Sequence, residues 1–171
     1  LLDEATSAAE AMIMMYNKRD KNLVKYDANI LLVDEHIFPQ TLKVLITRAE
    51  PLGIKVEKVN YKTASLTDKV FGVLVQFPNA DGSIEDYRAL VEKAHTQKAL
   101  ITVVADLMAL SIIVPPGEWG ADIVCGSTQR FGIPMGFGGP HAAYFATRDE
   151  LKRSMPGRII GITVDRNGNQ A

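Results

Sequence analysis

Hydrophobic and polar residues are arranged along the chain in blocks that predict helices and strands in turn. Over residues 3–16 the apolar positions recur every three or four residues, which places them on one face of a helix. Several later apolar runs lack polar alternation, as is typical of strands covered on both faces. We expect strands at 28–33, 54–61, 71–77, 100–105, 121–125 and 142–146.

Helix signals lie between these strands. Pro39 suits the first turn of a helix that ends before Gly53. Ser83 with Asp86 three positions later resembles a capping box, so we expect the next helix to begin there. A last helix is expected over 148–154. Strands that alternate with helices indicate parallel βαβ units, and therefore a three-layer α/β/α sandwich.

The composition fits one globular domain without surplus charge. The 171 residues are 47% apolar and 23% charged, close to globular averages. Lys and Arg number 19 and Asp and Glu 20, so the positive surplus that nucleic acids and anionic membranes attract is absent. The apolar runs are shorter than the ~20 residues that span a bilayer. We therefore expect neither nucleic acid nor membrane as a partner.

The single cysteine and the first residue also limit the possibilities. Cys125 alone can form neither an internal disulfide nor a multi-thiolate metal site, and inside an apolar strand it is expected to be an inert core thiol. The chain starts at Leu1 rather than Met, and helical pattern follows at once. We expect a piece of a longer protein, with residues 1–164 in a domain and the polar residues 165–171 beginning a continuation.

Polar residues that follow the strands are the candidates for chemistry, because open parallel sheets bind ligands beyond the carboxyl ends of their strands. Asp106 follows the strand at 100–105, where an unpaired carboxylate would be costly. It could pair with a protonated ring nitrogen, as in pyridoxal phosphate enzymes, or cap the next turn or pair with a basic side chain. His36, His95 and His141 lack metal-ligand spacing, so no metal site is predicted. His95, late on a helix, suits a dipole partner.

The glycine-rich stretch at 126–140 is the most informative loop. It contains five glycines and two prolines. Such a backbone can turn its amides outward, which suits an anion or a close partner. A plain connection is the alternative, but loops of this length inside compact domains are usually functional.

Five motifs follow one another along the chain. They are LLDEATSAAEAM at 1–12, PQT at 39–41, PPGEWGADI at 115–123, GSTQRFG at 126–132 with GFGGPHA at 136–142, and MPGR at 155–158. In this order they resemble the P-protein family of the glycine cleavage system, the decarboxylating glycine dehydrogenases of pyridoxal phosphate fold type I. The resemblance implies a large domain with a seven-stranded, mostly parallel sheet. The six strands counted here would be its second to seventh, with 142–146 antiparallel, and the first strand would precede Leu1.

The family consists of two homologous halves, and this chain resembles part of the N-terminal half. The cofactor lysine of the C-terminal half lies in a His-Lys-Thr-Phe segment, and Gln129 stands at that position here. An amide cannot form a Schiff base, so the resemblance implies a degenerate pocket, no catalytic residue and no decarboxylation by this chain alone. Phe38 stands where a family His is expected before Pro39.

The resemblance also implies weaker site assignments. Thr6 and Ser7 would lie at the helix start where such enzymes hold the cofactor phosphate, since a helix N-terminus suits an anion. Asp106 would lie at the position of the pyridinium partner. Gly138 and Gly139 would present backbone amides to the phosphate bound in the other half.

The implied function is that of the whole enzyme. It decarboxylates glycine on pyridoxal phosphate and passes the aminomethyl group to the lipoyl group of the H-protein. Glycine, the lipoylated H-protein and the C-terminal half would be the partners, and this half would support the site and the interface. A purely structural assembly module and an unrelated flavodoxin-like binding domain are the alternatives. We expect a cytoplasmic location in a bacterium, or alternatively the mitochondrial matrix.

Overall fold

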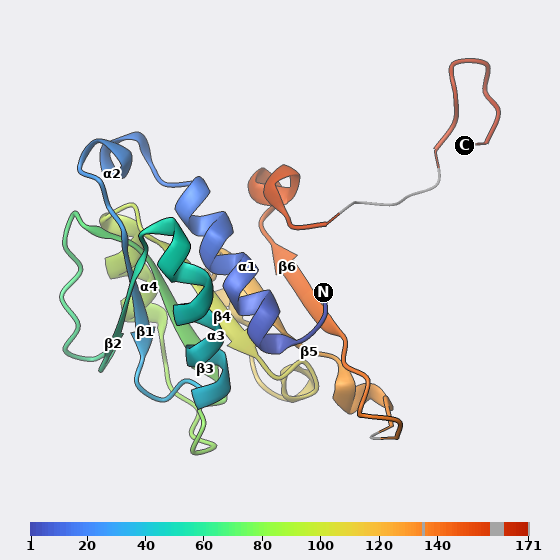
Figure 1. Cartoon of the computed structure of the whole chain (residues 1–171), viewed down its shortest axis with the longest axis horizontal. Coiled ribbons are helices and arrows are strands. Elements are labelled where there is room, and N and C mark those ends of the chain that lie inside the picture. Colours follow the sequence, from blue (N-terminus) through green and yellow to red (C-terminus); the bar gives the residue numbers. More distant parts are fainter. Residues whose placement is uncertain (135, 158–162, 171) are drawn as a thin grey trace.

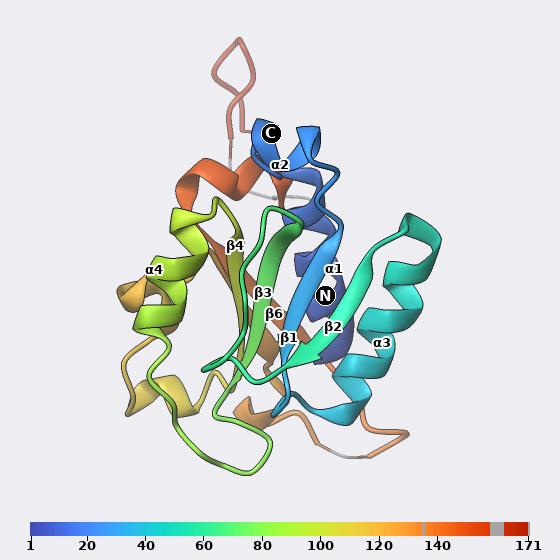
Figure 2. The same cartoon turned by 90° about the vertical axis from the view of Figure 1, so that its left-hand side faces the viewer.

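A computed structural model describes residues 1–134, 136–157 and 163–170 as a sheet with helices on both faces. The strand order is β2-β1-β3-β4-β5-β6, with β5 and β6 antiparallel and the other neighbours parallel. Helices α1 and α3 cover one face and α4 the other (Figure 2). The predicted three-layer, mostly parallel fold with 142–146 as its antiparallel strand is confirmed. The helices and strands are α1 (Glu4–Asn17), α2 (Lys21–Lys25), β1 (Ile30–Asp34), α3 (Pro39–Ala49), β2 (Lys55–Val59), β3 (Val70–Phe77), α4 (Arg88–Thr96), β4 (Leu100–Ala105), β5 (Ile123–Ser127) and β6 (Ala143–Thr147).

Two apolar cores lie on opposite faces of the sheet, which explains the strands without polar alternation. All of β3 is buried, with Leu74 in the core under α1 and Val75 in the core under α4. Helix α1 follows the predicted periodicity and buries Met12 and Met15 completely. A Cβ added at Gly72 would lie 2.9 Å from the Met15 sulfur, so the glycine allows α1 to pack closely on β3.

The predicted start of α4 is wrong. The helix begins at Arg88, and Ser83 does not cap it. Instead, the Asp81 carboxylate accepts hydrogen bonds from the Ser83 amide at 2.9 Å and the Ser83 hydroxyl at 2.7 Å, while Asp86 binds Arg88. The same residue types therefore build a turn before the helix, because short polar side chains bind nearby backbone as readily in turns as at caps.

Two further local differences concern short helices. The segment expected as a helix at 148–154 forms a 3-10 helix over Asp149–Ser154. The charged stretch before β1 contains α2, which the apolar pattern did not indicate and which Asp20 caps by accepting from the Asn22 amide at 2.9 Å. Arg158, the last residue of the MPGR motif, lies outside the described residues, as does Met135 in the glycine-rich stretch.

The glycine-rich stretch begins inside the sheet rather than after it. Gly126 and Ser127 are the last residues of β5, and the 3-10 helix Gln129–Phe131 follows directly. The remaining loop projects from the ends of β5 and β6 (Figure 1). Among the described residues, no helix is both long enough and apolar enough to cross a membrane.

Candidate functional site

A cavity of about 370 Å³ lies beyond the carboxyl ends of the parallel strands, where open α/β sheets bind ligands. The start of α1 forms one wall, and residues that end β3 and β5 or follow β4 form the others. Phe38, which precedes α3, contributes an aromatic ring to the lining. The lining residues are Glu4, Phe38, Gln76, Pro78, Asn79, Asp106, Ser127 and Arg130.

Asp3, the residue before α1, caps the first turn of this helix. One Asp3 carboxylate oxygen accepts from the Thr6 amide at 2.7 Å, and the other accepts from the Thr6 hydroxyl at 3.1 Å. Ser7 is fully buried, and its hydroxyl donates to the Glu4 carbonyl at 2.7 Å. Thr6 and Ser7 thus lie at the helix start as predicted, but these polar groups are already bound within the chain.

Glu4 joins α1 to β5 across the cavity. Its carboxylate accepts from the Ser127 amide at 3.3 Å and from the Gln76 side chain. Burial raises the pKa of Glu4, and the nearby charges of Asp106 and Asp3 add to the rise, while the two hydrogen bonds oppose it. The carboxyl group therefore lies in an environment that disfavours further negative charge. Sequence reasoning missed this residue, because an acidic residue in the first turn of a helix is ordinarily a solvated partner of the helix dipole.

Asp106 makes both contacts that the second interpretation from the sequence predicts. One carboxylate oxygen accepts from the Met108 amide at 3.0 Å and so caps the turn after β4. The other forms an ion pair with Arg130, which lies on the 3-10 helix after β5. The cavity therefore brings together Glu4, Asp106 and Arg130, and its one described cation is already paired with a carboxylate.

A second polar cluster lies on the α4 side of the strand ends. The Tyr87 hydroxyl lies 2.7 Å from Asn79 Oδ1 and 3.1 Å from Asp34 Oδ2. Burial and the nearby Asp34 carboxylate raise the pKa of Tyr87, so its hydroxyl keeps its proton. His36 Nδ1 lies 3.6 Å from Asp34 Oδ1, which is longer than a hydrogen bond. This cluster ties β1 to the turn after β3 and supports that wall of the cavity.

Comparison with known proteins identifies the family. The family model described as "Glycine cleavage system P-protein" matches residues 1–171. The chain belongs to this family. The prediction drawn from the five motifs is confirmed.

Relatives of this P-protein chain are much longer than it is. A glycine dehydrogenase (decarboxylating) of Bacteroides fragilis is 55% identical over 168 residues, which are 98% of this chain and 18% of that protein. A crystal structure of glycine decarboxylase (P-protein) in inhibitor-bound form gives a TM-score of 0.83 at 35% identity, over 99% of this chain and 38% of that one. The chain thus spans less than a fifth of its Bacteroides fragilis relative.

The fold extends beyond the P-protein family. A Campylobacter jejuni protein solved with N′-pyridoxyl-lysine-5′-monophosphate gives a TM-score of 0.68 at 12% identity, over 92% of this chain and 37% of that one. At this identity the likeness concerns the fold alone. It agrees with the large-domain fold that the resemblance to the P-protein family implied.

Gln129 of this P-protein chain lies next to the cavity in sequence. It follows β5 between Ser127 and Arg130, which both line the cavity, and its backbone amide donates to the Ser127 hydroxyl at 3.1 Å. Gln129 is thus two residues beyond the end of β5. A side-chain amide there offers no nucleophile for imine formation.

The two loop glycines of this P-protein chain are not among the residues that line that cavity. Gly138 and Gly139 have left-handed backbone angles, with φ of 93° and 71°, and a Cβ added at either would meet no heavy atom within 4 Å. Phe137 beside them also has positive φ and a fully exposed ring. The loop therefore keeps open space around both glycines, and the Gly139 amide donates to the Gly136 carbonyl at 3.0 Å.

Two other predicted residues have structural roles. His95 lies in the last turn of α4, as expected, and its Nε2 also lies 2.8 Å from the Asp122 carboxylate. Cys125 is completely buried, and burial raises its pKa to about 12, so the thiol is inert as predicted. Neither residue belongs to the cavity.

Proposed function

We propose that this chain forms the part of a P-protein that lacks the cofactor lysine and supports the catalytic site of the other half. The whole enzyme would decarboxylate glycine and pass the aminomethyl group to the lipoyl group of the H-protein. Pyridoxal phosphate, when bound in the other half, would supply the ring that accepts the electrons left by departing carbon dioxide. The family membership and the glycine dehydrogenase names of the relatives support this proposal.

The contacts around the cavity of this chain argue against pyridoxal phosphate as its ligand, and they carry the proposal. The Thr6 amide in the first turn of α1 is bound to the Asp3 carboxylate and so is not open to a phosphate. The charges of Asp3 and Asp106 already act on the buried Glu4 carboxyl, and a phosphate dianion beside them would add to the repulsion. Gln129 cannot form an imine. A role for this chain in catalysis must therefore be exerted outside its own cavity.

The glycine-rich loop is the part suited to such a role. Gly138 and Gly139 would present their amides to the phosphate held by the other half, and the Gly139 amide would exchange its bond to the Gly136 carbonyl for the phosphate. The open space around both glycines supports this assignment, because a partner could approach their backbone closely, and glycine tolerates the positive φ angles found there. A side chain with a branched Cβ would be strained at either position.

The test is Gly139→Val in the complete P-protein. We expect weaker pyridoxal phosphate affinity and slower glycine-dependent carbon dioxide exchange, with unchanged assembly of the two halves. Gly53→Val is the matched control, because Gly53 has a similar φ of 67° and equally open space but lies in the turn after α3, far along the chain from the loop.

Unchanged cofactor affinity in Gly139→Val would contradict a direct contribution of the loop. If activity also survives in Gly138→Val, the chain is better described as an assembly module that only scaffolds the other half. The internal contacts of the cavity are compatible with scaffolding as well. The Gly138→Val and Gly139→Val variants therefore decide between a direct contribution to the site and an assembly role.

A further inference from the structure

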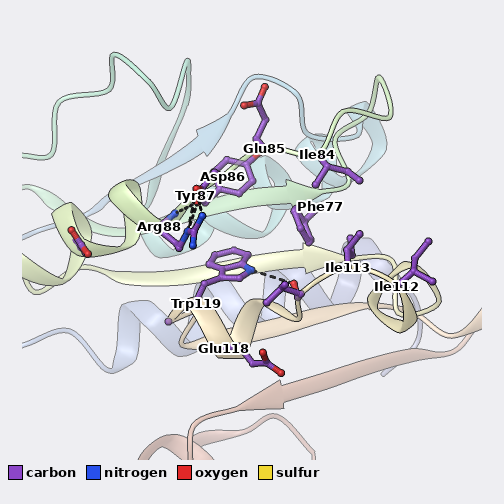
Figure 3. Close-up of a pocket in the computed structure, with 13 residues that line it drawn as sticks. Phe77, Ile84, Glu85, Asp86, Tyr87, Arg88, Ile112, Ile113, Glu118 and Trp119 are labelled. Carbon is purple, nitrogen blue, oxygen red and sulfur yellow. Dashed lines mark hydrogen bonds and ion pairs between the residues drawn. The ribbon is translucent and has the colours of Figure 1, made fainter.

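A groove of about 770 Å³ lies on the α4 face of the molecule, apart from the cavity at the start of α1. Its walls come from the segment before α4 and from the segment between β4 and β5. Figure 3 shows Ile84 on one wall and Ile112 and Ile113 on the other, with the ring of Phe77 between them. Trp119 closes one side, and its indole donates to the Val114 carbonyl at 3.4 Å.

The apolar residues of this groove are exposed to an unusual degree. Ile112 is 87% exposed, Val114 59% and Ile84 58%. These three side chains lie beside a supporting aromatic cluster in which the Phe77 and Trp119 ring centres are 5.8 Å apart. Exposed aliphatic side chains that line one groove beside packed aromatic rings mark an interaction surface, whereas isolated exposed apolar residues are ordinary.

The rim of the groove is acidic. Asp86 is neutralised by Arg88, and Glu85 by Lys62. Glu92 and Glu118 also line the groove, and neither carboxylate has an ion-pair partner within the part of the chain that the structure describes. The groove therefore combines an apolar centre with unbalanced negative charge at its edge. The complementary surface is apolar with a Lys or Arg beside it.

We propose that this groove is the docking site for a segment of the remainder of the P-protein, one that presents aliphatic side chains flanked by Lys or Arg. The apolar centre would bury the aliphatic side chains, and Glu92 and Glu118 would pair with the flanking cations. This surface is separate from the cavity and from the loop of Gly138 and Gly139. The proposal depends on the chain being part of a longer P-protein, but not on either of those roles.

The length of the relatives argues that the occupant comes from the same protein. The chain covers 18% of the Bacteroides fragilis relative, so most of a P-protein lies outside the residues described here. Permanent interfaces have more apolar centres than transient ones. Ile112, Val114 and Ile84 together make such a centre, which favours a segment that stays bound over a partner that comes and goes.

The test places a photo-crosslinking amino acid, p-benzoylphenylalanine, at position 112 in the complete P-protein. We expect cross-linking to a peptide outside these 171 residues that carries Lys or Arg next to aliphatic residues, identified by mass spectrometry. Val24, another exposed aliphatic residue at 54%, lies on α2 and serves as the control position. It should not label that peptide.

Charge reversal separates this surface from a merely apolar contact. Glu92→Lys with Glu118→Lys should reduce the yield of that cross-link, with the larger loss at low ionic strength because exposed charges are screened by salt. Glu57→Lys on β2 is the control, since Glu57 is exposed and lies outside the groove. Its yield should stay unchanged.

The outcomes that overturn the proposal are distinct. Mixing 15N-labelled and unlabelled protein shows whether the peptide comes from a second copy, and a parallel sample with H-protein shows whether that protein is the occupant. Cross-linking to either alone contradicts the proposal. Because the bulky probe could disturb the groove, amide hydrogen exchange of residues 109–114 is measured in the unmodified complete protein. Fast exchange there also contradicts it.

Discussion

The cavity at the strand ends and the glycine-rich loop are both attached to β5, yet their polar groups are directed differently. At the cavity, the carboxylates of Glu4 and Asp106 bind groups of the same chain, as does the carboxylate of Asp3 at the start of α1. In the loop, Gly138 and Gly139 have a left-handed backbone with open space around it, although the Gly139 amide donates to the Gly136 carbonyl at 3.0 Å. The charged groups of the first region are therefore paired within the domain, while the second region is open to another molecule.

This difference separates polar groups that hold the domain together from backbone that stays accessible. The Asp3 carboxylate accepts from the Thr6 amide, and the Glu4 carboxylate accepts from the Ser127 amide. Because these bonds join the residues at the start of α1 to one another and to β5, they contribute to the packing of the domain.

The largest effect is expected from a substitution in β5, the strand to which the cavity and the glycine-rich loop are both attached. In Gly126→Ala the new Cβ would lie 2.1 Å from the Ala105 carbonyl oxygen and 2.9 Å from the Tyr144 ring. The strands would have to separate, and overpacking of this kind typically costs about 1 to 3 kcal/mol and occasionally more. Urea unfolding should show a lower midpoint. Gly117→Ala, with open space around the new Cβ, should change stability by less than about 0.5 kcal/mol. Equal midpoints for the two variants would refute the argument from close approach.

The strands and long helices could be predicted from sequence because their burial leaves a direct pattern. All of β3 is buried and reads as an apolar run in which Gln76 is the one polar side chain, while α1 buries one face and repeats at helical spacing. The start of α4 could not be predicted this way, because Ser83 and Asp86 serve a turn with the same hydrogen-bonding groups that would serve a cap.

The candidate site was predictable in position but not in its contacts. Asp106 follows a strand and therefore had to lie at the carboxyl edge of the sheet. Its partner Arg130 is 24 positions away and comes close only because β4 and β5 are neighbours. Glu4 is a polar residue at the start of a helix, and no local pattern indicates that packing against β5 will bury it.

A smaller effect on stability is expected from replacing the Glu4 carboxyl group. Burial raises the pKa of Glu4 from its ordinary value of 4.5, so the folded state binds the proton more tightly than the unfolded state. The favourable contribution is fully present below the unfolded value and is lost as the pH rises through the folded value. Glu4→Gln should therefore be more stable than the parent at neutral pH and nearly equal to it below the ordinary pKa. Unfolding free energies across this range measure the difference.

The matched control for this titration is Glu57→Gln, because Glu57 is exposed on β2 and outside the cavity. Its free energy of unfolding should follow that of the parent at every pH. If Glu4→Gln lowers stability at neutral pH, the hydrogen bonds from Ser127 and Gln76 outweigh burial. The Glu4 carboxylate would then be a stabilising contact rather than a tolerated one.

The smallest effect is expected from restoring a lysine alone. Gln129→Lys places an amine one residue before Arg130, which lines the cavity, but the Thr6 amide stays bound to Asp3 and the Glu4 carboxyl still lines the cavity. After incubation with pyridoxal phosphate and borohydride, mass spectrometry should find no more labelling at position 129 than at exposed lysines such as Lys58.

Adding Asp3→Asn and Glu4→Gln to Gln129→Lys tests whether negative charge at the start of α1 keeps pyridoxal phosphate from reacting at position 129. Both changes remove negative charge while keeping similar shape, so a phosphate near the start of α1 is no longer repelled by these two groups. Labelling at position 129 should then exceed that at Lys58. Full labelling of the single variant would show that the missing lysine was the whole barrier. Equal labelling of single and triple variants at the background level would show that the Arg130 pair with Asp106, or the shape of the cavity, excludes the cofactor instead.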